Sequence, residues 1–222
     1  MPVTASRILT AAVACAAVAV SASGCAPAFN DARLVPPGQV EITPSVSGTG
    51  ATADGSSEYL LNTFSVQGQV GVHERVNLGM AYARFQPREG NDGINTVAFG
   101  ARIGLVKDRV AVSLPVGFAV RDDIAVSDTL SMYPAVLFTA PVSQHIDLNP
   151  SVRFLIPLCR ECGIEDTLVG FNMGVGLRAS PRLIIRPEVG FVVNPGESGV
   201  VWTFGVGTSV AIGKGAGSGG SR

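Results

Sequence analysis

The amino-acid sequence predicts an all-β chain that folds as an antiparallel, up-and-down transmembrane β-barrel of ten strands. Ten stretches between residues 39 and 212 alternate apolar residues with small or polar ones, which is the period-two pattern of a strand with two different faces. The connections between these stretches are alternately long and short, as in barrels with loops on one membrane face and tight turns on the other. No apolar run after residue 24 reaches the length of a spanning helix, so membrane insertion must be by strands.

The first 24 residues predict a secretory signal peptide. Arg7 is their single charged residue, an apolar run covers residues 8–20, and small residues follow up to Gly24. A basic start, a short apolar core and a small-residue end are typical of a signal that is cleaved from the mature chain. We therefore assign residues 1–24 to this signal.

The signal ends in Ala22-Ser23-Gly24-Cys25, which resembles the lipobox of bacterial lipoproteins with Ala22 in place of the usual Leu. The resemblance implies that Cys25 is the lipidated first residue of the mature chain. The alternative is an ordinary signal peptide followed by an incidental cysteine. Residues 25–38 contain three prolines and no periodicity, and we interpret them as a lipid-anchored tether that leads to the first strand.

The β-barrel is predicted over residues 39–212, and a flexible Gly/Ser-rich tail follows over residues 213–222. Most of the predicted strands are long enough to cross a bilayer at a tilt. They cover residues 39–47, 61–72, 76–85, 95–106, 110–121, 129–142, 146–158, 167–178, 183–193 and 200–212.

Prolines fall inside several of these predicted strands, and each one removes a donor from the hydrogen-bonded ladder. We expect bulges or shifted strand ends to accommodate several of them. They are Pro44, Pro115, Pro134, Pro141, Pro150, Pro157 and Pro187.

The alternation assigns one face of each strand to lipid and the other to the lumen. In the second strand, for example, Phe64, Val66 and Val70 alternate with Gln67 and Gln69. Because a charge on the lipid face near the midplane costs about 2–4 kcal/mol, charged residues within strands should face inward. Eight share that inward parity and are predicted to face the lumen: Glu41, Arg102, Arg121, Asp147, Arg153, Arg178, Arg186 and Glu188.

These inward charges have two interpretations. One is a narrow pathway that prefers anions, or a binding site for an acidic solute, because arginines outnumber carboxylates in the set. The other is that arginines and carboxylates pair with each other to fill a narrow lumen. The sequence leaves both open.

Residues 39–212 resemble small bacterial outer-membrane β-barrels in architecture, without the motif of a specific family. The resemblance implies a place in the outer membrane of a Gram-negative bacterium, with long loops extracellular and both termini periplasmic. It also implies outer-membrane lipid and the barrel assembly machinery as partners. Trp202 and Phe204 are the nearest substitute for the terminal aromatic residue that this machinery commonly recognises.

The long connections, beginning with residues 48–60, contain eleven acidic residues and two arginines. These acids could bind divalent cations that bridge to lipopolysaccharide, or they could serve only solubility. The 15 basic and 17 acidic residues after residue 24 leave no basic excess for nucleic acid. Several aromatic residues near the long-loop ends suggest an interfacial girdle: Phe64, Tyr82, Phe85, Phe118, Phe191 and Trp202.

Little in the chain suggests catalysis. Known barrel enzymes of the outer membrane use a histidine near the outer rim, whereas His73 and His145 both fall in predicted short turns. Cys159 and Cys162, with two residues between them, are expected to form a loop disulfide rather than a metal or redox site. We therefore expect neither enzymatic activity, nor a metal site, nor a cofactor.

The sequence favours a non-enzymatic outer-membrane barrel with a structural role or a role in narrow small-solute passage. The alternative is a periplasmic, lipid-anchored soluble β-barrel or sandwich that binds a ligand. The two differ in which face is apolar. A soluble barrel would bury residues such as Val66, Phe99, Val116, Phe171 and Val175, and would expose Arg102, Arg153 and Arg186.

Overall fold

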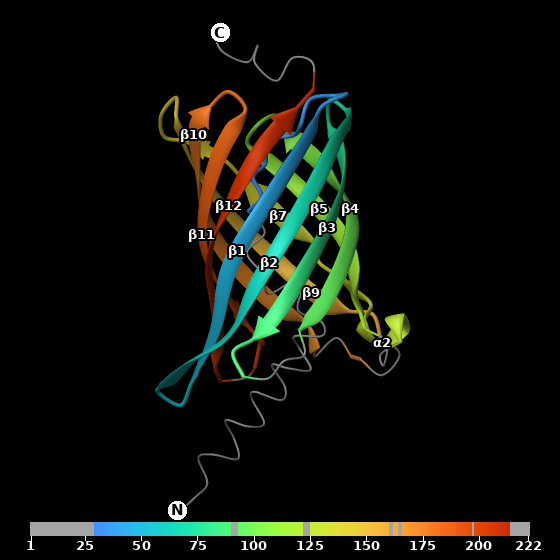
Figure 1. The fold of residues 1–222 in the computed structure, drawn as a ribbon, viewed down its shortest axis with the longest axis vertical. Coiled ribbons are helices and arrows are strands. Elements are labelled where there is room, and N and C mark those ends of the chain that lie inside the picture. Colours follow the sequence, from blue (N-terminus) through green and yellow to red (C-terminus); the bar gives the residue numbers. More distant parts are fainter. Residues whose placement is uncertain are drawn as a thin grey trace, which may run out of the picture.

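The computed structural model describes residues 29–89, 93–121, 125–159, 162–163, 166–196 and 198–213. The predicted signal peptide, Cys25 and residues 214–222 of the tail lie outside them. The described residues form a closed antiparallel β-barrel of ten strands (Figure 1). No helix among them has the length and apolarity needed to span a bilayer.

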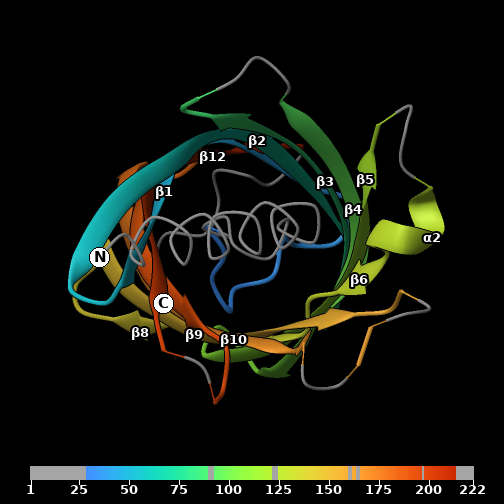
Figure 2. The ribbon, with the colours of Figure 1, turned by 90° about the horizontal axis from the view of Figure 1, so that it is seen from below.

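Nine barrel strands are continuous, and the sixth consists of three short pieces, β6, β7 and β8. A single turn of helix, α2 (Val126–Thr129), precedes the sixth strand on the outside of the barrel (Figure 2). The strands are β1 (Val40–Ala53), β2 (Ser56–His73), β3 (Val76–Pro87), β4 (Ile94–Val106), β5 (Val110–Val120), β6 (Ser131–Met132), β7 (Ala135–Phe138), β8 (Ala140–Pro141), β9 (Ile146–Pro157), β10 (Leu168–Ser180), β11 (Leu183–Val193) and β12 (Val200–Ile212).

The barrel closes between its first and last strands. β1 pairs with β12 in antiparallel register from Val40 opposite Ile212 to Thr52 opposite Val200. The other strands pair with their neighbours along the chain. Closure satisfies both sides of every strand, which is the condition for strands in a bilayer.

The observed strands follow the predicted ones closely, with β11 and β12 agreeing in both bounds. The main difference is the predicted long connection 48–60, which is mostly strand. β1 continues to Ala53 and β2 starts at Ser56, so that a long hairpin extends beyond the barrel rim (Figure 1). Its two turn residues, Asp54 and Gly55, have φ values of 51° and 77°. Asp-Gly favours such a turn because both positions need a positive φ.

The prolines follow the prediction only in part. Pro134 lies in the break between β6 and β7, and Pro157 ends β9, as expected for residues without an N–H donor. Pro44, Pro115, Pro150 and Pro187, by contrast, lie inside strands whose register is unchanged on either side. The register shifts that do occur, for example between Thr49 and Gly50, are not at these prolines.

The outer face of the barrel is apolar and the inner face carries the charges. Phe99 is 51% exposed and Val66 is 42% exposed, whereas Arg102 and Arg186 are 6% and 4% exposed. This is the reverse of what a soluble barrel requires, so the exposures contradict that alternative. The described chain has the face arrangement of a transmembrane barrel.

Aromatic rings cover two outward-facing glycines near the long-loop end of β1. The rings of Trp202 and Phe204 stack with centroids 6.0 Å apart, and Tyr59 lies 6.4 Å from both. Together they occupy the space beside Gly48 and Gly50 that side chains would fill. Such aromatic cover restores packing where a strand lacks side chains.

Phe85 does not belong to the expected interfacial girdle. It is 2% exposed and faces the lumen. Phe85 lies two residues after the buried Ala83 in β3, so both side chains point to the inner face of the barrel. The assignment of Phe85 to the outer girdle was therefore wrong.

We predict that Gly50→Ala destabilises the barrel by about 1–3 kcal/mol, because a methyl group there would overlap the indole of Trp202 and the carbonyl of Glu58. Trp202 is the chain's single tryptophan, so its emission reports ring displacement directly. Urea unfolding gives the free energy. The matched control is Gly68→Ala, whose added carbon would lie 4.0 Å from Met80 Cγ. Equal spectra and stabilities for the two variants would contradict the packing described here.

We also predict that Val189→Arg lowers the free energy of unfolding in lipid vesicles by about 2–4 kcal/mol, because the residue faces outward in the middle of β11. Leu105→Arg is the control, with a cost of about 0–1 kcal/mol, since Leu105 lies one residue from the end of β4. Both side chains are 58% exposed. A Val189→Arg barrel as stable as the control would show that Val189 does not face hydrocarbon.

Candidate functional site: the lumen

Near the long-loop end of the lumen lies a cluster of apolar side chains, here called the apolar layer. They come from the ends of strands on all sides of the barrel and form one buried cluster, with Leu61 and Val201 packed against it. Burying these chains together excludes water from that end of the lumen. The apolar layer consists of Ala83, Phe85, Ile94, Ala119, Tyr133, Leu155, Leu168 and Val192.

The rest of the lumen contains the chain itself. Residues 29–38, here called the N-terminal segment, run inside the ring of strands (Figure 2). At the short-turn end, Pro37 bridges to Gly71 and the Gly38 N–H donates to the Gly71 carbonyl at 2.9 Å. At the other end of the segment, the Phe29 N–H donates to Glu188 Oε2 at 2.9 Å, halfway along β11. The stretch interpreted as a tether therefore follows a path through the lumen before it enters β1.

Ion pairs join the N-terminal segment to the barrel wall. Arg186 Nη1 lies 2.7 Å from Asp31 Oδ2, and both side chains are about 5% exposed. Arg33 Nη2 lies 2.6 Å from Asp147 Oδ1, and Asp147 also pairs with Arg178. Charged groups far from bulk water need such partners, so these pairs fix where the segment lies.

Wall-to-wall contacts complete the charge pairing. Arg186 Nη2 lies 3.7 Å from Glu41 Oε1, and Arg186 Nε donates to Ser209 Oγ at 2.7 Å. Arg153 Nη2 lies 3.6 Å from Glu188 Oε1. Most of the inward arginines thus pair with carboxylates, which agrees with the second of the two interpretations of the sequence.

Neutral contacts hold the segment as well. The Phe29 ring packs over Gly205 and Gly207 of β12, where an added carbon on Gly207 would lie 2.9 Å from Phe29 Cγ. The Ala32 N–H donates to Thr139 Oγ1 at 2.9 Å. In the amide orientation that satisfies both of its groups, Asn77 accepts from the Val35 N–H at 2.8 Å and donates to the Val35 carbonyl at 3.1 Å.

A cavity of about 140 Å³ remains between the N-terminal segment and the wall formed by β2–β5, β7 and β9. It lies beneath the apolar layer, since Ala83 and Tyr133 belong to both linings. Arg102 and Arg153 are its charged lining residues, and no carboxylate is among the side chains that line it.

The structure places seven of the eight predicted lumen residues inside the barrel: Glu41, Arg102, Asp147, Arg153, Arg178, Arg186 and Glu188. Arg121 follows the last residue of β5 and is exposed. Sequence reasoning missed the residues of the N-terminal segment that meet this set, namely Asn30, Asp31 and Arg33. The available signal was the pair of inward glycines at 205 and 207, which leave space for a second chain.

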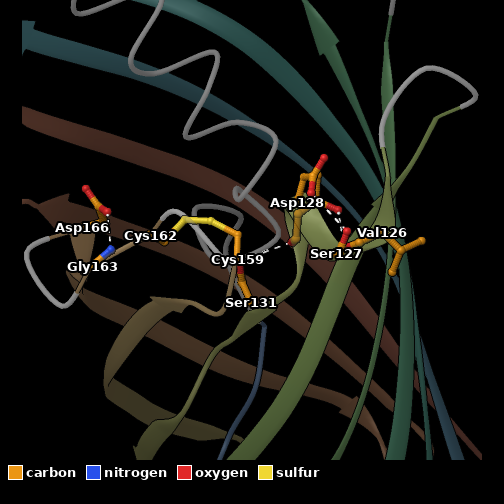
Figure 3. The surroundings of a disulfide bond; sticks show 9 residues. Val126, Ser127, Asp128, Ser131, Cys159, Cys162, Gly163 and Asp166 are labelled. Carbon is orange, nitrogen blue, oxygen red and sulfur yellow. Dashed lines mark hydrogen bonds between the residues drawn. A yellow bond between two sulfur atoms is a disulfide. The ribbon is translucent and has the colours of Figure 1, made fainter.

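The residues weighed for chemistry lie elsewhere. Cys159 and Cys162 form a disulfide after β9, with the Gly163 N–H donating to Asp166 Oδ2 at 2.8 Å beside it (Figure 3). His73 ends β2 and His145 precedes β9, so both belong to the short-turn end. Among the described residues, no group of three or more His, Cys, Asp or Glu side chains is placed to hold a metal ion.

The strands, the apolar layer and the N-terminal segment define a closed transmembrane β-barrel whose lumen contains part of the chain itself. No family model matches the chain, and no curated protein matches it. Several solved structures, by contrast, are similar to it in fold. An outer-membrane channel of Pseudomonas putida F1 superposes with a TM-score of 0.50 at 12% identity, over 82% of this chain and 98% of that chain.

Two other solved barrels are similar at lower scores. The translocator domain of the autotransporter NalP from Neisseria meningitidis has a TM-score of 0.45 at 10% identity, over 90% of this chain and 96% of that chain. Ail, the attachment invasion locus protein of Yersinia pestis, has a TM-score of 0.37 at 11% identity, over 79% of this chain and 99% of that chain. At such identities the likeness concerns the fold alone.

We predict that Asp31→Ala releases the N-terminal segment, because it leaves the buried Arg186 with only Glu41 at 3.7 Å and Ser209. Breaking a buried pair costs about 3–5 kcal/mol. The measurement is trypsin cleavage after Arg33 in the folded protein, detected by mass spectrometry. We expect slow cleavage in the wild type, fast cleavage in Asp31→Ala, and wild-type behaviour in the control Asp128→Ala, which changes an exposed carboxylate in α2. Equal cleavage rates in all three proteins would contradict the anchoring role of the pair.

Proposed function

We propose that this chain is a non-enzymatic β-barrel of a Gram-negative outer membrane with a structural role, and that its lumen does not conduct. One observation carries the proposal: the apolar layer and the N-terminal segment lie one after the other along the lumen. A solute would have to displace both. The contribution of such a barrel then comes from its lipid-facing wall and its loops.

The proposed orientation places the long loops outside the cell and the short turns in the periplasm, as in other outer-membrane barrels. Exposed acids near the long-loop end, such as Glu58 in β2, Glu89 after β3 and Asp128 in α2, support a role for divalent cations in bridging to lipopolysaccharide. Outer-membrane lipid and the barrel assembly machinery are its further proposed partners. Cys25 is the proposed site of lipid attachment.

The absence of enzymatic activity is part of the proposal. A hydrolase of the outer-membrane barrel type needs a general base near the outward mouth. Both histidines lie at the opposite end, which argues against that chemistry.

A second candidate function is narrow passage of small solutes, controlled by the N-terminal segment. The cavity beside the segment favours it, since a space of about 140 Å³ next to polar contacts would widen if the segment moved. In this case the segment acts as a gate, and the side chains of the apolar layer must also move apart to let a solute pass.

We predict that the wild-type barrel gives no conductance steps in planar bilayers. The structural role also predicts no steps for Asp31→Ala, because the apolar layer remains when the segment is released. Gated passage predicts steps in Asp31→Ala alone. Insertion is checked by heat-modifiable gel mobility, and a conducting porin is the positive control. Steps from the wild-type barrel would refute the proposal of a sealed lumen.

A further inference from the structure

The lumen contains one more arginine than it has carboxylates. The described groups are Arg33, Arg102, Arg153, Arg178 and Arg186 on one side and Asp31, Glu41, Asp147 and Glu188 on the other. Arg33 and Arg178 share Asp147 and are 30% and 25% exposed, so water solvates them in part, whereas a buried arginine without an ion pair favours an additional anion.

Arg102 is a buried arginine without an ion pair among the described residues. Its side chain is buried, and its Nη2 donates to Asn30 Oδ1 of the N-terminal segment. Its Nε has no hydrogen-bond partner among the described residues. Asp31 and Glu41 act on Arg102 electrostatically, but both carboxylates pair with Arg186. Within the described chain, no carboxylate lies within ion-pair distance of Arg102.

The cavity of about 140 Å³ opens directly onto this arginine. Across the sheet, Arg102 is opposite Ser113, Ser113 is opposite Ala135, and Ala135 is opposite Arg153. Two short side chains therefore lie between two arginines in a single row of the wall. The space exists because these positions, together with nearby inward alanines and glycines, do not fill it.

The polar side chains of the lining suit an oxyanion. Thr96 and Ser113 line the same cavity and carry hydroxyl groups, while Ser65 and Gln69, which also line it, hydrogen-bond to Ser45 and Asn30. A guanidinium with neutral donors around it matches the oxygens of a phosphate, sulfate or carboxylate better than it matches a spherical ion. A volume of about 140 Å³ is large enough for one such ion.

We propose that the cavity between the N-terminal segment and β2–β5 is a binding site for one small oxyanion, with Arg102 as its principal ligand. Asn30 lies against the same guanidinium, so a seated N-terminal segment completes the site. This proposal depends on the proposed function in one respect: both require the N-terminal segment to lie in the lumen. Its test is a binding measurement, which conductance does not influence.

The experiment is equilibrium dialysis of the refolded full chain in detergent against radiolabelled inorganic phosphate. We expect saturable binding of one phosphate per barrel, competition by sulfate, and weak competition by chloride. Arg102→Gln should weaken binding about tenfold or more. Arg84→Gln is the matched control and should bind like the wild type, because Arg84 is exposed and contacts Asn95.

A second variant separates loss of the site from loss of the fold. Ala135→Val narrows the cavity but keeps Arg102, and it should also weaken binding while heat-modifiable mobility shows a folded barrel. The absence of saturable phosphate binding by the wild type would overturn the proposal. So would unchanged binding by Arg102→Gln, and chloride competing as well as sulfate would overturn the assignment of an oxyanion.

Discussion

The ion pair between Asp31 and Arg186 is the contact on which the rest of the lumen depends. Arg186 projects inward from β11 at membrane depth, where a charge must find a partner within the barrel. Its nearest counter-charge, at 2.7 Å, belongs to the N-terminal segment rather than to the wall. The closest partner of this wall charge is therefore supplied by the segment, with Glu41 of the wall farther away at 3.7 Å. Once the segment is seated, Arg33 reaches Asp147, Asn30 reaches Arg102, and the remaining cavity acquires its shape.

Different groups occupy the interior of the barrel at the two ends of the lumen. Near the long loops, apolar side chains from the wall pack together in one buried cluster. Farther down, the wall carries glycines where it approaches the segment: Gly205 and Gly207 accommodate the Phe29 ring, and Gly71 accommodates the backbone of Val35 and Pro36. Where glycines leave the wall without side chains, the N-terminal segment occupies the space, and this maintains packing in the interior.

Most of the barrel was predictable from the sequence because its determinants are local. Period-two alternation located every strand, and it assigned Arg102, Arg153 and Arg186 to the inner face. The path of the N-terminal segment was not predictable in this way, since Asp31 and Arg186 are 155 residues apart and neither is part of a local pattern that names the other. The extended β1–β2 hairpin was predictable in principle, because Asp54-Gly55 is a known turn signal. Its small and polar residues were interpreted as loop instead.

The closure of β1 against β12 has a consequence for the order of assembly. The N-terminal segment precedes β1, yet its partners include residues of β9, β11 and β12, the last parts of the chain to be made. The N-terminal segment can be enclosed while β1 and β12 pair, or it can insert into a barrel that has already closed. Enclosure during strand pairing avoids the insertion step. In this order of assembly, the contacts between residues farthest apart in the sequence form last. We therefore expect the barrel to fold slowly, with the pairing of β1 and β12 as the rate-determining step.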